Sequence, residues 1–129
     1  MKAAYPIIIT PAEEGGYVVY VPDMQINTQG ETIAECMDMA RDAISLVGIC
    51  DQDMGNEIPA ASGVLPAHDE NEVVTFVDVD FDAYRRAQDT RAVRKNVTIP
   101  SYLNDLAEKA GVNFSQVLQT ALKQQLGVQ

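Results

Sequence analysis

The chain has 129 residues, of which 47% are hydrophobic, and a formal net charge of -10 at pH 7. This length supports one modest core, or a small core plus an element that a partner stabilises, and it excludes a large multidomain enzyme. There is no run of 18 apolar residues, and Pro11 interrupts the apolar stretch near the start. We therefore expect neither a membrane span nor a signal peptide, and predict a cytoplasmic protein.

The charges divide along the chain. Residues 1–82 contain two Lys or Arg against 16 Asp or Glu, a balance of -14, whereas residues 83–129 contain seven against three, a balance of +4. Opposite balances indicate two modules with different partners, one that repels phosphate and one that attracts it. We predict domains over residues 1–86 and 94–129, joined by a linker over residues 87–93.

The first module begins with the pattern of a β-hairpin. Two β-rich runs, Tyr5 to Thr10 and Tyr17 to Val21, flank a turn that contains Gly15 and Gly16. A short third strand is predicted around Ile26 to Thr28.

A helix should follow, because Thr32 and Glu35 have the spacing of a capping box. Apolar residues at steps of three and four predict its buried face. They are Ile33, Met37, Ala40, Ile44 and Val47. The acidic residues of the opposite face are Glu31, Glu35, Asp38 and Asp42. This acidic face serves either solubility or the binding of a partner.

The remainder of the module reads as a polar loop over Asp51 to Glu72 and a final strand over Glu72 to Asp82. A helical turn should begin near Tyr84. Cys36 and Cys50 have no His or Cys at metal-ligand spacing, so both are predicted to be buried, reduced thiols.

The stretch over residues 94–100, RKNVTIP, has the alternation of a strand with Val97 and Ile99 on one side. The side chains that can hydrogen-bond from the other side are Arg94, Asn96 and Thr98. Pro100 should end the strand, because it lacks an N–H, and suits the start of a helix.

Two helices should complete this second module. The first runs from Ser101 to Ala110 before Gly111, and the second follows an N-cap at Ser115 and ends before Gly127. So small a unit cannot bury its leucines alone, and its one strand has no partner within it. We therefore predict dimerisation. The expected dimer contacts are Val97, Ile99, Leu106, Leu118 and Leu122.

Antiparallel pairing of two such strands would form a two-stranded ribbon, an element that fits the DNA major groove. Arg reads guanine there, Asn reads adenine and Thr serves either, while free N–H groups at the start of the second helix suit a backbone phosphate. The candidate DNA-binding residues are Arg94, Lys95, Asn96, Thr98, Asn113 and Ser115.

Four stretches carry a resemblance to known families. Residues 94–122 resemble the ribbon-helix-helix DNA-binding domain, through RKNVTIP and the leucines, Gly111 and Phe114-Ser115 that follow. The first module resembles the HicB antitoxin family in residues 15–23, in residues 28–32 and in residues 77–84.

This resemblance implies an α+β protein with an N-terminal partial ribonuclease-H-like sheet, one main helix and a C-terminal ribbon-helix-helix dimerisation domain. It further implies an antitoxin without catalytic activity or cofactor, which binds a basic, mRNA-cleaving HicA toxin and, with it, represses its own operon at operator DNA. We expect the toxin contacts at Tyr17, Asp23, Met24 and Gly30.

Two other functions are compatible with the residues. Asp78, Asp80 and Asp82 would share one face of a strand, where clustered carboxylates can hold divalent metals for a small nuclease. Alternatively, the chain is an acidic adaptor that binds only proteins.

Overall fold

The computed structural model describes all 129 residues and divides into two compact units, Met1–Arg91 and Ala92–Gln129. The first unit combines a four-stranded sheet with two helices, and the second contains two further helices. The predicted α+β class is therefore confirmed. None of the helices has both the length and the apolar character that crossing a membrane requires.

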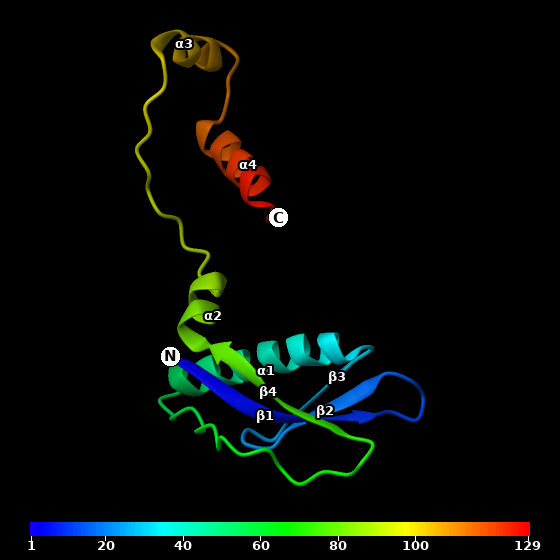
Figure 1. The fold of residues 1–129 in the computed structure, drawn as a ribbon. Helices are drawn as coiled ribbons and strands as arrows, with labels where there is room; N and C mark the ends of the chain where they lie inside the picture. The colour runs from blue at the N-terminus through cyan, green and yellow to red at the C-terminus, as the bar shows by residue number, and fades with distance from the viewer. The chain divides into compact units, whose positions relative to one another are not determined.

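The sheet of the first unit is antiparallel throughout and has the order β3-β2-β1-β4 (Figure 1). Its strands are β1 (Lys2–Pro11), β2 (Tyr17–Val21), β3 (Ile26–Gly30) and β4 (Val73–Asp80). The predicted hairpin and the third strand are both confirmed. The first and last strands of the unit, β1 and β4, pair along eight residues, so β4 lies on the side of β1 opposite to β2.

Helix α1 (Ile33–Asp53) lies across one face of the sheet (Figure 1). The Thr32 hydroxyl accepts the Glu35 N–H at 3.1 Å, so the predicted N-cap is present. The helix continues to Asp53, and the prediction that a loop starts at Asp51 was wrong. Between Gly48, which the helix accommodates, and Gly55 there is no glycine or proline, so nothing local stops the helix at Asp51.

The core lies between α1 and the covered face of the sheet. On β1 the buried residues include Tyr5, Ile7 and Ile9, as period-two alternation requires. The Tyr5 and Phe81 rings meet edge to face, with centroids 6.3 Å apart. The other apolar core residues are Val19, Val21, Cys36, Ala40, Ile44, Ile49, Val77 and Val79.

Two of the helix predictions need correction. Val47 is exposed, because the buried stripe of α1 passes through Ile44 and Gly48. Cys36 is buried as predicted, but Cys50 is exposed, since it follows the buried Ile49 onto the outer side of the helix.

Two glycines set how closely α1 approaches the rest of the unit. A Cβ atom built on Gly30 would lie 2.9 Å from the Cys36 sulfur, and one built on Gly48 would lie 2.2 Å from the Phe81 ring. Both distances are shorter than any carbon contact in a packed core. Gly30 and Gly48 therefore leave the room that Cys36 and Phe81 occupy.

Strand β4 ends at Asp80, and helix α2 (Phe81–Gln88) begins directly after it. The Asp80 carboxylate accepts the Ala83 N–H at 3.1 Å and caps the helix. The prediction of a strand through Asp82 was therefore wrong by two residues, and Asp82 lies in the first helical turn.

The second unit consists of α3 (Ser101–Lys109) and α4 (Phe114–Leu126). Gly111 and Gly127 have φ of 70° and 69°, the left-handed conformation with which glycine ends a helix. Neither helix contains a buried residue. Residues 89–100 form no helix or strand in the single chain, where a strand would have no partner, so the ribbon remains a prediction.

We predict that Gly48→Ala destabilises the first unit by about 1–3 kcal/mol, because the added methyl group overpacks the Phe81 ring. In an exposed helix the same change would instead stabilise by up to about 1 kcal/mol. Urea denaturation followed by far-UV circular dichroism measures the difference. In a chain that already carries Phe81→Leu, Gly48→Ala should cost less stability than it does in the unchanged chain, because the smaller side chain leaves room for the methyl group. Equal losses in the two backgrounds would contradict the clash.

Candidate functional site

The turn between β2 and β3 carries two of the residues predicted to contact a toxin, Asp23 and Met24. The Asp23 carboxylate accepts the backbone N–H of Ser62 at 2.7 Å, so it holds a segment 39 residues away. Met24 is half-buried and packs against the core. The next residue, Gln25, is the one non-glycine residue with positive φ, at 53°. This turn is therefore a fixed feature of the surface.

Tyr17 and Gly30, the other two predicted toxin contacts, face each other across β2 and β3. Tyr17 is half-buried against the core, and Gly30 is buried beneath Cys36. Gly30 has no side chain that could contact a toxin. The close approach of Cys36 in α1 explains why a glycine stands at this position. Tyr17 is partly accessible, at the end of β2 that lies away from the β2–β3 turn.

A long segment, Met54 to Glu72, joins α1 to β4 without helix or strand. Near its start the Tyr5 hydroxyl donates to the Pro59 carbonyl oxygen at 2.6 Å. Ile58 and Ala61 pack against the core close by. Burial of the phenol, and secondarily the charge of Asp23, raise the pKa of Tyr5 above its ordinary value of 10.0.

The far end of this segment is held through Glu72. Its carboxylate accepts the Asp69 N–H at 2.8 Å and the Thr10 hydroxyl at 2.7 Å. These hydrogen bonds, the first of them foremost, lower the pKa of Glu72. The segment is thus attached to β1 at both ends and to the β2–β3 turn through Asp23.

The three aspartates considered as a metal site have separate roles. Asp78 pairs with Arg41 at 3.2 Å, Asp80 caps α2, and Asp82 pairs with the N-terminal ammonium of Met1. The Ala83 N–H bound to Asp80 is the main reason that the pKa of this carboxyl is lowered. The arrangement that a two-metal nuclease requires is not formed, and no group of three His, Cys, Asp or Glu in the chain could hold a metal ion.

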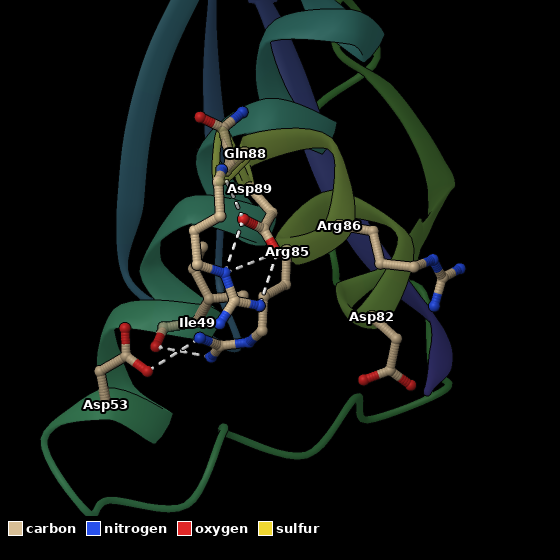
Figure 2. Close-up of a pocket in the computed structure, with 8 residues that line it drawn as sticks. Ile49, Asp53, Asp82, Arg85, Arg86, Gln88 and Asp89 are labelled. Atoms are coloured by element: carbon tan, nitrogen blue, oxygen red, sulfur yellow. Dashed lines mark hydrogen bonds and ion pairs between the residues drawn. The ribbon is translucent and has the colours of Figure 1, made fainter. Parts of the chain in front are cut away.

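A hollow of about 680 Å³ lies in the first unit where α2 meets the end of α1 (Figure 2). Arg85 crosses it and donates to Asp53 at 2.9 Å and to Gln52 at 3.1 Å. Figure 2 shows Arg86 pointing away from this cluster. Because the Arg85 guanidinium is already hydrogen-bonded, it fastens α2 to α1 and leaves no built site for an anion.

In the second unit the predicted DNA-contacting residues of the 94–98 stretch are all exposed. The predicted N-cap at Ser115 was wrong, because the Asn113 side chain accepts the Gln116 N–H at 3.1 Å and caps α4. Ser115 lies one residue inside the helix, where its hydroxyl accepts from Gln119 at 3.2 Å. Asn and Ser are comparably good N-cap residues, and α4 begins at Phe114, directly after Asn113.

The predicted dimer contacts share one property, exposure in the single chain. Their exposed fractions are 69% for Val97, 39% for Ile99, 60% for Leu106, 38% for Leu118 and 49% for Leu122. A set of large apolar side chains this exposed has no core of its own to pack into. These positions are therefore available to a partner.

Residues missed by the sequence reasoning lie in the long segment. Ser62 binds Asp23 through its backbone, which no side-chain pattern could have revealed. For Val64 and Leu65 the sequence does carry a signal: they are two adjacent large apolar residues in a loop rich in glycine, proline and alanine. Both are exposed.

Comparison with protein families gives one match over most of the chain. The model of the HicB_like antitoxin of bacterial toxin-antitoxin systems matches residues 5–121.

Individual relatives agree with this match. Antitoxin HicB of Escherichia coli K12 is 54% identical over 41 residues, which are 31% of this chain and 30% of that protein, so the match spans less than a third of the relative. The Burkholderia pseudomallei antitoxin HicB structure is 26% identical, with 96% of each chain covered and a TM-score of 0.53. A chain of a toxin-antitoxin complex from Streptococcus pneumoniae shares the fold at 22% identity, covering 97% of this chain and 99% of that one, with a TM-score of 0.56.

We predict that the stability of the first unit falls as pH rises above about 10. The raised pKa of Tyr5 means that the folded state holds the phenol proton more tightly than the unfolded state. The resulting contribution to the free energy of unfolding is complete below about pH 10, and it is lost as the pH rises through the pKa of Tyr5 in the folded state. Urea denaturation at pH 8 to 11 measures it. Tyr5→Phe should cost about 1 kcal/mol at pH 8 and reduce the alkaline slope. Burial also raises the pKa of Tyr84, so part of the alkaline slope should remain in Tyr5→Phe. A slope in Tyr5→Phe equal to that of the unchanged chain would contradict the assignment to Tyr5.

Proposed function

The chain belongs to the HicB-like antitoxin family of bacterial toxin-antitoxin systems, and from this membership we propose that it neutralises a HicA-type toxin and represses its own operon. The family is one of antitoxins and not of enzymes, which agrees with the prediction from the sequence. Toxin binding is assigned to the first unit and operator binding to the second. Both partners, the mRNA-cleaving toxin and the operator, place the function in the cytoplasm.

The observation that carries the toxin assignment is the family match together with the charge of the first module. Residues 1–82 have two basic residues against 16 acidic ones, a balance of -14. An enzyme that binds RNA has a basic surface, so this charge would speed encounter and disfavour competing nucleic acid. Asp23 and Met24 lie in the β2–β3 turn, and Tyr17 lies at the other end of the same hairpin, opposite Gly30; we place the contact along this hairpin.

Co-expression of this chain with the HicA-type toxin encoded beside it tests the assignment. We expect a complex that survives affinity purification and native mass spectrometry, and whose RNA-cleaving activity is suppressed relative to free toxin. Affinity should fall at higher salt, because opposite charges drive the encounter. A toxin that cleaves RNA equally well with and without the chain would refute the proposal.

The argument for the second unit rests on its lack of a core. No residue of α3 or α4 is buried in the single chain, although both helices carry leucines at helical spacing. We place a second copy over these faces, with the two 94–100 segments paired as an antiparallel ribbon. Pairing would bury Val97 and Ile99 on one side, as period-two alternation requires.

The opposite side of this ribbon is assigned to DNA. Arg94, Asn96 and Thr98 are exposed and have the donors and acceptors that read base edges in the major groove. Lys95 adds positive charge for the phosphates. At α4 the Asn113 side chain occupies one N–H, which leaves the first N–H groups, near Ser115, for a backbone phosphate.

We predict that Arg94→Ala weakens operator binding by about 1–3 kcal/mol while the dimer persists, because one bidentate base contact is lost. Electrophoretic mobility shift at fixed salt and size-exclusion chromatography with light scattering measure the two properties. Leu118→Glu is the matched variant: a buried charge at the dimer interface should give monomers and abolish operator binding. Equal operator affinity of Arg94→Ala and the unchanged chain would remove Arg94 from base reading.

A further inference from the structure

The segment from Met54 to Glu72 is unusually long for a connection without regular structure inside a compact unit. Such segments are usually either disordered linkers or binding loops. This one is fastened at Pro59 by Tyr5, at Ser62 by Asp23 and at Glu72 by Thr10. Three hydrogen bonds of 2.6–2.7 Å to the sheet and its turn are unexpected for a linker. They indicate a binding loop that is held in one conformation.

Between the attachments at Ser62 and Glu72 the loop presents apolar side chains to solvent. Val64 is 68% exposed and Leu65 is 46% exposed. The exposed part of these side chains does not stabilise the unit, but it provides apolar area that a partner can bury. Their proximity in sequence to Ser62 places them next to the Asp23 attachment.

The charges around this apolar pair select the kind of partner. No Lys or Arg occurs between Arg41 and Arg85, whereas the loop itself carries Glu57, Asp69, Glu70 and Glu72. An exposed apolar pair in a loop whose charged residues are all acidic suits a basic protein with an apolar centre to its contact surface, and disfavours nucleic acid or another copy of this acidic unit.

We propose that Val64 and Leu65 form a contact surface for the basic toxin, and that Asp23 acts on this surface as a positioning residue. The inference rests on the proposed function and deepens it. The Asp23 carboxylate is occupied by the Ser62 N–H, so it holds the loop in place beside Met24. The toxin-binding surface is then composed of the β2–β3 turn and the loop fastened to it.

The first experiment removes the apolar contact. Leu65→Ser, with the co-purified HicA-type toxin as ligand, should weaken binding about tenfold or more in isothermal titration calorimetry. Leu46→Ser is the matched control, since Leu46 is 47% exposed but lies on α1. Equal effects of the two changes, or no effect of Leu65→Ser, would overturn the surface. A change in the oligomer size of the chain without toxin would assign the patch to a second copy instead.

The second experiment separates positioning from direct contact. Asp23→Asn removes the charge but keeps an oxygen that can accept the Ser62 N–H, whereas Asp23→Ala removes both. We expect Asp23→Ala to weaken toxin binding several-fold more than Asp23→Asn, and to speed hydrogen exchange of the Ser62 amide in the free chain. Equal losses for Asn and Ala with unchanged Ser62 exchange would show that the Asp23 charge contacts the toxin directly.

Failure of this inference is distinguishable from failure of the proposed function. If the unchanged chain does not bind the toxin, the proposed function fails. If it binds, and Leu65→Ser binds equally well, only the loop surface is wrong.

Discussion

The close approach of α1 to the sheet is the constraint on which the first unit depends. Gly30 and Gly48 stand where any side chain would overlap Cys36 or the Phe81 ring. Phe81 in turn meets Tyr5, whose hydroxyl holds the long loop at Pro59. The same packing that makes the core therefore also fixes the exposed loop, since Tyr5 contributes its ring to one and its hydroxyl to the other.

The second unit has the opposite constraint, because its stability must come from outside the single chain. Two helices of nine and 13 residues without buried side chains cannot offset the conformational entropy of folding. The dimer that we propose would supply the missing burial and, at the same step, duplicate the basic 94–100 segment. Under this proposal folding, assembly and DNA recognition would be one coupled process, so the population of DNA-competent protein would depend on its concentration.

Sequence predicted what local chemistry determines. The hairpin glycines, the Thr32 cap and the stop at Gly111 follow from rules that act over a few residues, and the structure contains all three. The contact between Gly48 and Phe81 and the hydrogen bond from Ser62 to Asp23 join distant parts of the chain. A glycine in a helix and a backbone N–H in a loop have no pattern of their own, so neither could be predicted.

The separation of charge connects the two units as a functional design. If the acidic and basic residues were mixed, the acidic ones would repel the operator phosphates and the basic ones would repel the toxin. The sign of the charge changes after Asp82, close to the Arg91 boundary between the units, so each of the two proposed partners would meet a surface of the appropriate sign. Under the proposed function one short chain would hold a basic enzyme at one unit and a polyanion at the other, because each would be attracted to only one unit.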